Sequence, residues 1–380
     1  MTFGLSSDQS RLLEDARRIA RDSLAPVAAR GEPGRVNRPL LAALKEEGLL
    51  PRLFPERAGG SQTAGVSAME LCLLREALAQ GSIEAETALA MQGIGGYPIL
   101  QSGSEEAVQR WVPEVARGEA VAAFALTEPE HGSDAAAIEL VAARDGDGYR
   151  LTGVKTWISN APDADVYTIF ARTTPGAGAR GVTAFALAGD TPGLSGRPIE
   201  LISPHPIGTL ELDGVFVPTS SVLGEVDAGF KVAMQTLDLF RPSVGAFAVG
   251  MAQAALDTAA QHAGSRQAFG RPISQFQAVS HLLAEMATRT ESARLLVYAA
   301  ASAYDERKSG LTKLSAMAKL FATETAQFVV DGAIQVHGAA ALERGHLLEH
   351  LYREVRAPRI YEGTSEIQRE IIARELYRSG

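Results

Sequence analysis

One acidic residue near the end of the chain has the surroundings that a catalytic base requires. Glu362 follows Tyr361, precedes Gly363 and stands directly before an expected helix start. Ser365 and Gln368 have the spacing of a capping box, which predicts that a helix begins at about Ser365. Gly363 allows the backbone to turn sharply in front of that helix. Glu362 would then be held on a short, fixed loop, as a base that must reach one particular proton needs.

The plain alternative is an acidic residue ahead of a helix N-terminus, where the helix dipole favours negative charge. Glu362 taken alone favours this alternative, because many carboxylates occupy such positions without any chemistry. The rest of the chain must therefore supply the groups with which a base would act.

The composition is that of an ordinary globular protein and excludes several classes of function. The 380 residues can build a large core and two or three subdomains. A net charge of −9 argues against a nucleic-acid partner, because phosphate binding needs clustered Lys and Arg. The single cysteine, Cys72, excludes internal disulfides, and the apolar stretch Met69–Leu78 around it predicts a buried structural thiol. Residues 1–21 lack a signal pattern and no apolar run could span a membrane, so we expect no membrane insertion and a cytoplasmic location.

The residue pattern changes twice along the chain and predicts an α+β multi-domain protein that is mainly α. Residues 1–119 have helical periodicity and are expected to form an all-α domain. Residues 120–225 contain short β-type runs separated by turn residues, as in an antiparallel β-sandwich or barrel. Residues 226–380 return to long amphipathic stretches typical of a helical bundle. The expected strands include Val166–Ala171, Val182–Leu187 and Val215–Val217, and the expected helix stripes are Val279, Leu282, Leu283, Met286 and Leu314, Met317, Phe321, Phe328.

Two short motif matches are better explained without their usual ligands. Residues 176–181 fit G-x-G-x-x-G, but β-type runs lie on both sides, so a glycine-rich hairpin loop is favoured over a phosphate loop. Residues 346–350 fit the zinc motif H-x-x-E-H, but no pattern indicates a third ligand. We therefore expect a surface helix there and no metal site.

The loop expected at residues 125–134 could bind a planar heteroaromatic ring with a charged linker. It offers hydroxyl groups at Thr127 and Ser133 and flexible backbone at Gly132. By itself the same run could be a polar turn.

Three further segments add aromatic rings and a guanidinium group. Trp157 is followed two residues later by the hydroxyl of Ser159. Arg266 is suited to a pyrophosphate, and Phe269 and Phe276 are suited to an adenine ring.

Together with the segment around Glu362, these motifs resemble the acyl-CoA dehydrogenase family, and they recur in the family's order and spacing over essentially the whole chain. The resemblance implies an N-terminal helical domain, a middle antiparallel β domain, a C-terminal helical bundle and FAD as the cofactor. The implied cofactor contacts are Phe124, Leu126, Thr127, Gly132, Ser133, Trp157, Ser159, Arg266, Phe269, Phe276, Gln277, Gln335, Gly338, Ala339, Thr364 and Glu366. The implied substrate contacts are Ser133, Asp238, Phe240, Arg241 and Gly363.

The resemblance also implies a role for Glu362, which matches the family's catalytic base. That base removes the α-proton of an acyl thioester while a hydride leaves the β-carbon for flavin N5. Some relatives carry the base on a helix, as a Glu just before the Arg that matches Arg241. Phe240 occupies that position here and cannot accept a proton. Glu362 is therefore the expected base, and the run 241–246 is most like the medium-chain branch.

The expected function is that of an FAD-dependent acyl-CoA dehydrogenase of acyl-CoA metabolism, a homotetramer or homodimer that passes electrons to an electron-transfer flavoprotein. Two departures from the family pattern, in residues 338–341 and 201–218, leave the substrate class open. One alternative is a flavin oxidase or biosynthetic desaturase acting on a CoA or carrier-protein thioester, which oxygen consumption would reveal. Another is a catalytically silent FAD-binding homologue, against which the retained Glu362 argues. A zinc hydrolase would hold metal and lack the yellow flavin colour.

Overall fold

The computed structural model describes residues 4–63 and 65–378, which divide into two compact units. The first unit comprises Met1–Arg21, Ser67–Glu86 and Asp238–Gly380, and the second comprises Asp22–Val66 and Thr87–Leu237. Helices α5 (Ile83–Ser102) and α7 (Gly229–Ser265) run from one unit into the other. None of the helices in the described ranges is long and apolar enough to cross a membrane.

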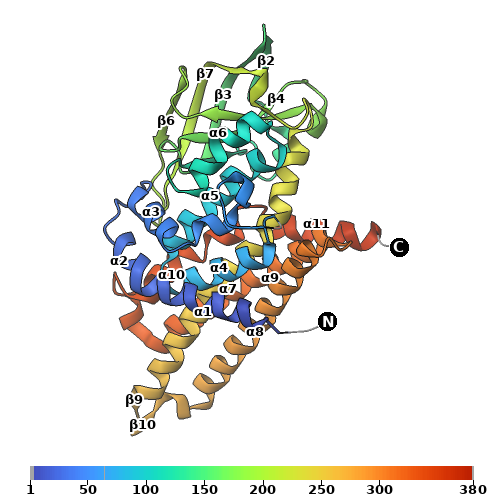
Figure 1. The fold of residues 1–380 in the computed structure, drawn as a ribbon. Coiled ribbons are helices and arrows are strands. Elements are labelled where there is room, and N and C mark those ends of the chain that lie inside the picture. Colours follow the sequence, from blue (N-terminus) through green and yellow to red (C-terminus); the bar gives the residue numbers. More distant parts are fainter. Residues whose placement is uncertain (1–3, 64, 379–380) are drawn as a thin grey trace. The chain divides into compact units, whose positions relative to one another are not determined.

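The first unit is built from helices, with α8 and α9 packed side by side along their length (Figure 1). Helix α4 contacts both α1 and α8, and α9 also contacts α10 and α11. The helices are α1 (Ser7–Ile19), α4 (Ala68–Gly81), α8 (Gln277–Asp305), α9 (Leu311–His337), α10 (Leu347–Glu354) and α11 (Ser365–Arg378), with short 3₁₀ turns at Ile273–Gln275, Gly338–Leu342 and Ala357–Arg359. A two-stranded hairpin, β9 (Gln267–Ala268) and β10 (Arg271–Pro272), precedes α8.

Side chains cap the N-termini of two helices in the first unit. Ser6 and Gln9 form a capping box at the start of α1, with bonds of 3.2 and 2.9 Å. At the start of α4, Asp305 from the end of α8 accepts a bond from the backbone N–H of Ala68 at 2.7 Å and one from the hydroxyl of Ser67 at 2.8 Å. A carboxylate is favourable at a helix N-terminus. The end of α8 is thereby fixed to the start of α4.

Helix α7 approaches its neighbours closely because glycines face them. A Cβ added at Gly245 would lie 2.7 Å from Cγ2 of Val297 in α8, and one added at Gly250 would lie 2.7 Å from Cβ of Ala79 in α4. Neither contact is possible for a larger residue without movement of a helix. These two positions therefore fix how α4 and α8 pack against α7.

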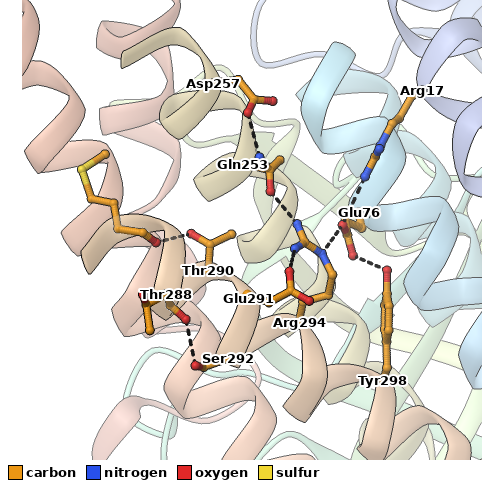
Figure 2. Close-up of polar contacts among 11 residues, drawn as sticks. Arg17, Glu76, Gln253, Asp257, Thr288, Thr290, Glu291, Ser292, Arg294 and Tyr298 are labelled. Atoms are coloured by element: carbon orange, nitrogen blue, oxygen red, sulfur yellow. Dashed lines mark hydrogen bonds and ion pairs between the residues drawn. The ribbon is translucent and has the colours of Figure 1, made fainter. Parts of the chain in front are cut away.

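A buried polar network links four helices of the first unit (Figure 2). The fully buried carboxylate of Glu76 in α4 accepts bonds from Arg294 at 2.9 Å and Tyr298 at 2.8 Å, both in α8, and pairs with Arg17 of α1 at 3.5 Å. Arg294 also donates to Gln253 of α7 at 2.7 Å. The bonds from Arg294 and Tyr298 and the ion pair with Arg17 satisfy the carboxylate of Glu76, so the core can hold this buried charge.

One expected apolar stripe is less buried than its period suggests. Met286 of α8 is buried, but Phe321 of α9 remains 37% exposed. The fully buried face of α9 consists mainly of small residues, among them Ala318 and Ala322. Small side chains allow helices to pack closely, so residue volume, and not hydropathy alone, determines which face is inside.

The second unit combines short helices with one eight-stranded sheet. Its helical elements are α2 (Ala25–Ala28), α3 (Arg38–Glu46), α6 (Glu105–Ala116) and a π-helical turn at Ala20–Leu24, with 3₁₀ turns at Leu50–Leu53, Glu56–Ala58, Ala135–Ala137, Gly178–Gly181 and Thr219–Ser221. Its strands are β1 (Ala122–Ala125), β2 (Val141–Asp145), β3 (Gly148–Ser159), β4 (Val166–Arg172), β5 (Val182–Ala188), β6 (Leu194–Pro198), β7 (Ile207–Pro218) and β8 (Val222–Leu223). The strand order is β6-β7-β3-β2-β4-β5-β8, with β1 added parallel to β4. The three predicted strands are confirmed as β4, β5 and part of β7.

The structure also shows what the two motif matches form, for which no ligand was expected. Residues 176–181 connect the antiparallel strands β4 and β5, so the glycine-rich hairpin is confirmed. His346 precedes α10 and accepts the N–H of Leu348 through Nδ1 at 3.1 Å, while Glu349 pairs with Arg353 at 2.7 Å. Within the described ranges no group of His, Cys, Asp and Glu could hold a metal ion. Cys72 is buried as expected, and burial raises the pKa of its thiol.

Candidate active site

Glu362 lies on strained backbone directly before α11. Its φ is +53°, and that of Gly363 is +92°. The left-handed region costs free energy for a residue with a side chain, so the surrounding contacts must hold Glu362 there. Helix α11 begins at Ser365 as predicted, but the capping box is wrong: Thr364 Oγ1 accepts the N–H of Ile367 at 3.3 Å and is the cap. Ser365 instead donates to Glu324 of α9 at 2.6 Å.

Three side chains hold the main-chain carbonyl groups of this loop. Arg241 of α7 donates from Nε to the carbonyl of Glu362 at 3.2 Å. Lys319 of α9 donates from Nζ to the carbonyl of Gly363 at 2.7 Å. Gln368 of α11 donates to both carbonyls, at 3.1 and 3.0 Å. The backbone of the loop is thus fixed from three helices while the carboxylate of Glu362 is left out of these bonds.

The carboxylate of Glu362 is buried and surrounded by cations. Its Oε2 atom is buried and has no hydrogen-bond partner among the described residues. Burial raises the pKa of Glu362, while the positive charges of Arg75, Arg241 and Lys319 act to lower it. Burial also lowers the pKa of Lys319 to about 8 and that of Arg241 below its usual range. The site therefore contains a carboxylate whose basicity is raised by desolvation and limited by nearby charge.

Arg75, which no motif pointed out, is connected to this site through α7. Its Nε forms an ion pair with Glu86, and its Nη1 donates to the hydroxyl of Ser243 at 2.7 Å. Ser243 in turn donates to the carbonyl of Phe240 at 2.6 Å, one residue before Arg241. The guanidinium and carboxylate of the pair are 2% and 1% exposed. Arg75, a residue of α4, is therefore a fixed buried charge, and its bond to Ser243 holds it against the turn of α7 that contacts the Glu362 loop.

The expected substrate contacts on α7 lie in this turn as well. Asp238 pairs with Arg241 at 3.7 Å, and burial raises the pKa of Asp238. The side chain of Phe240 is buried. The structure thus places Asp238, Phe240 and Arg241 on one turn of α7, and Arg241 of that turn contacts the loop of Glu362 and Gly363.

In the second unit, a buried lysine shapes the loop that follows β1. Lys155 of β3 is fully buried and donates from Nζ to the carbonyl of Leu126 and to Glu128, both at 2.8 Å. Glu128 also accepts the backbone N–H groups of Glu139 at 2.6 Å and Leu140 at 3.0 Å. Burial lowers the pKa of Lys155 to about 8.

This arrangement fixes the first of the expected flavin contacts. Thr127, between Leu126 and Glu128, also accepts the N–H of Thr156 through its carbonyl at 3.0 Å. Phe124, on β1, packs against Phe170 with ring centroids 4.9 Å apart. Further along the same run, Gly132 and Ser133 are exposed.

Trp157 and Ser159 lie where β3 departs from regular pairing with β7. The register shifts between Lys155 and Ile158, and Trp157 has a φ of +57° and is 54% exposed. A strained backbone that exposes a large aromatic ring is typical of a ligand site. The hydroxyl of Ser159 lies 2.8 Å from Nε2 of His205, a second residue that no motif indicated.

The expected contacts for the ADP half are mostly on exposed positions of the first unit. Phe269 turns the β9–β10 hairpin with a φ of +52° and is 94% exposed. Its ring centroid lies 6.0 Å from that of Phe276, over which Arg271 stacks at 4.1 Å. Arg266 precedes this hairpin, Gln277 begins α8, and both are exposed.

The remaining expected contacts stand at helix ends of the first unit. Gln335 is on the last turn of α9, Gly338 ends that helix with a φ of +67°, and Ala339 follows; all three are exposed. Glu366 is in the first turn of α11 beside the capping Thr364, and backbone and hydroxyl hydrogen bonds lower the pKa of its carboxyl group.

Three models of the acyl-CoA dehydrogenase family match the chain in sequence. The N-terminal domain model matches residues 6–119, the middle domain model residues 123–215 and the C-terminal domain model residues 227–377. Cyclohexane-1-carbonyl-CoA dehydrogenase of Geobacter metallireducens is 36% identical over 378 residues, which cover 98% of each chain. The human mitochondrial short-chain specific acyl-CoA dehydrogenase is 37% identical over 99% of this chain and 91% of its own.

Solved structures of full length have the same fold. Butyryl-CoA dehydrogenase from Megasphaera elsdenii is 34% identical, with a TM-score of 0.93 and complete coverage of both chains. A chain from a study of the electron transferring flavoprotein of Acidaminococcus fermentans is 36% identical, with the same TM-score and coverage. The FAD complex of PigA is 33% identical, again at 0.93 and complete coverage.

Proposed function

This chain belongs to the acyl-CoA dehydrogenase family, and we propose that it uses FAD to introduce an α,β double bond into an acyl-CoA thioester. The observation that carries the proposal is the carboxylate of Glu362, which is buried, leaves Oε2 without a partner among the described residues and stands on strained backbone held by three helices. Such a group has no evident structural task. It has the position and environment of a general base.

The residues proposed to hold FAD have chemistry that fits this cofactor. Trp157 and Phe269 expose large aromatic rings on left-handed backbone, which suits stacking against flat rings. Thr127 and Ser159 add hydroxyl groups, and Arg266 adds an exposed guanidinium suited to a pyrophosphate. When bound, FAD supplies the acceptor for the hydride that leaves the β-carbon.

The part of this chain in the proposed reaction is the removal of the α-proton. Burial raises the pKa of Glu362 and strengthens it as a base, while the positive charges of Arg75, Arg241 and Lys319 oppose this shift. We assign Oε2 as the atom that receives the proton. Because Arg241, Lys319 and Gln368 bond to main-chain carbonyls, the loop keeps its position when the carboxylate becomes neutral.

The substrate is proposed to be a short or cyclic acyl-CoA, because the relatives named above act on cyclohexane-1-carbonyl-CoA and butyryl-CoA. Ser133, Asp238, Phe240, Arg241 and Gly363 are its proposed contacts. An electron-transfer flavoprotein is the proposed acceptor, and a homotetramer or homodimer the proposed assembly. We also propose the domain division 1–119, 120–225 and 226–380, which the ranges of the three family models support.

Anaerobic titration of the purified protein with acyl-CoA thioesters tests the reaction. We expect the flavin band to bleach with butyryl-CoA or cyclohexane-1-carbonyl-CoA. Glu362→Gln should retain FAD but lose turnover by about 10³-fold, which is within the usual contribution of a general base. Glu370→Gln, which alters an exposed carboxylate of α11, the helix that follows the Glu362 loop, is the matched control and should be unaffected.

Three results would contradict the proposal. Near-normal turnover of Glu362→Gln would remove Glu362 as the base. A colourless protein that cannot take up FAD would remove the cofactor. Rapid oxygen consumption with release of hydrogen peroxide would identify a flavin oxidase instead of a dehydrogenase.

A further inference from the structure

His205 is held firmly against the end of β3 in the segment between β6 and β7. The backbone N–H of His205 donates to the carbonyl of Ser203 at 2.8 Å, and the carbonyl of Pro206 accepts the N–H of Asn160 at 2.8 Å. Beside it, Ser159 pairs in register with Ile207. These main-chain bonds place the His205 ring next to Ser159 independently of any bond between the two side chains.

The side-chain contact itself is short and partly buried. Nε2 of His205 lies 2.8 Å from Oγ of Ser159, which is within the ordinary range for a hydrogen bond. Burial lowers the pKa of His205 to about 4. The ring is therefore neutral at physiological pH and carries one N–H and one nitrogen lone pair.

A hydroxyl group has a single proton, so a fixed neighbour decides what it can offer to a second partner. If His205 donates its proton to Oγ, the proton of Ser159 is free to be donated elsewhere. If His205 accepts, Ser159 can present only a lone pair. Ser159 is half-buried, so one part of its surface remains open to a ligand.

We infer that His205 is a positioning residue that donates from Nε2 to Ser159 and thereby orients the Ser159 hydroxyl as a hydrogen-bond donor toward the bound flavin. The inference rests on the proposed function, in which Ser159 is one of the residues that hold FAD. The oxidised ring presents a lone pair at N5, and a donor stabilises that form. His205 lies in residues 201–218, one of the stretches in which the sequence departs from the family pattern, so the family resemblance does not supply this role.

The direct test is the midpoint potential of the bound flavin in a set of variants. In His205→Leu the hydroxyl is no longer oriented, so the equilibrium between oxidised and reduced flavin should shift at least about tenfold toward the reduced form, or about 30 mV for a two-electron couple. His205→Gln keeps an amide N–H and should recover part of the shift. Thr209→Val is the matched control, because it removes a buried hydroxyl contact, to Thr156 at 3.3 Å, from the same pair of strands. It should leave the potential unchanged.

A double-mutant cycle separates orientation of Ser159 from a general loss of structure. In a Ser159→Ala background, His205→Leu should produce no further change in potential. The seven histidines of the chain also allow ¹⁵N-histidine labelling, in which the His205 signal, identified by its absence from His205→Leu, should show the Nε2–H tautomer.

Each contrary result overturns the inference. An unchanged potential in His205→Leu, an equal shift in the Ser159→Ala background, or an Nδ1–H tautomer would each do so. Such results would leave the proposed function intact as long as the protein binds FAD and acyl-CoA bleaches it. Failure to bind FAD in the unaltered protein would instead refute the proposed function.

Discussion

Replacing Lys155 by Met should destabilise the second unit by about 3 kcal/mol and weaken FAD binding. Lys155 is fully buried, and its ammonium group donates to Leu126 and Glu128 at 2.8 Å each. Removal of one partner from a buried ion pair typically costs about 3–5 kcal/mol. We expect the lower end of this range, because Glu128 would keep two bonds from the N–H groups of Glu139 and Leu140.

Replacing the other partner of the pair, Glu128, should lower the free energy of unfolding further. Glu128→Ala leaves the ammonium group of Lys155 with one carbonyl and leaves both backbone N–H groups unpaired, and each charge-assisted bond contributes about 1.5–3 kcal/mol. We expect a loss of about 4–5 kcal/mol. The double variant removes both charges together, so it should lose about 2–3 kcal/mol less than the sum of the single variants.

Chemical denaturation of the four proteins measures this coupling, and FAD affinity provides a second readout. In Lys155→Met the loop of residues 126–128 would lose its main restraint. FAD should then bind at least about tenfold more weakly if Leu126 and Thr127 contact the flavin. Arg150→Met is the control: Arg150 pairs with Asp145 at 2.7 Å in the same sheet, but both are about half exposed, and such pairs contribute less than about 1 kcal/mol. Additive losses in the double variant would refute the pairing argument, and unchanged FAD affinity would refute the positioning argument.

Two further predictions concern pH. Arg75→Met should raise the pKa of Glu362, and Glu86→Gln, which removes the negative charge beside Arg75, should lower it. The acidic limb of the plot of kcat/KM against pH should therefore move in opposite directions in the two variants. Equal shifts would exclude an electrostatic role for Arg75. The pKa of His205 is lowered from 6.5 to about 4, so between these pH values the unfolded chain binds more protons than the folded one. The free energy of unfolding should therefore fall as pH drops through this window, by at most about 3 kcal/mol. A His205→Leu variant whose free energy of unfolding, measured by denaturation, has the same pH dependence would contradict this.

The sequence was most informative where local chemistry determines structure. The strands at Val166–Ala171 and Val182–Leu187 and the hairpin between them follow from β-branched and aromatic residues separated by glycine. The start of α11 at Ser365 was predicted from the S-x-x-Q spacing, and the helix does begin there, although Thr364 and not Ser365 caps it. In each case the deciding contacts lie within a few residues along the chain.

The capping-box prediction was wrong because it considered only contacts between residues that are close in sequence. The S-x-x-Q spacing assumed that Ser365 and Gln368 satisfy each other's backbone groups. Instead, Ser365 donates to Glu324 on α9, and Gln368 donates to the carbonyls of Glu362 and Gly363. Tertiary partners compete for these side chains, and a motif in a single sequence cannot show that α9 is close to the loop.

Two of the residues that the sequence did not reveal, Arg75 and Lys319, are buried charges whose partners are distant along the chain. Arg75 interrupts the apolar run Met69–Leu78, and Lys319 lies between apolar residues of α9, which were the available signals. A lysine or arginine in an amphipathic helix is usually a solvated or snorkelling side chain. The choice between that role and a buried one depends on whether a carbonyl or carboxylate from another element reaches it.

Both units use the same physical device to fix a loop beside a proposed site residue. Lys155 donates to the carbonyl of Leu126 in the second unit, and Lys319 donates to the carbonyl of Gly363 in the first. A loop carbonyl without a helix or sheet partner must be satisfied when it is buried, and an ammonium group can do so from a neighbouring element. The cost of burying each lysine is seen in its pKa, lowered to about 8 in both cases. The functional loops are therefore fixed by lysines that are close to losing their charge. The nearby carboxylates, Glu128 in one unit and Glu362 in the other, raise the pKa of these lysines and so help to keep them charged.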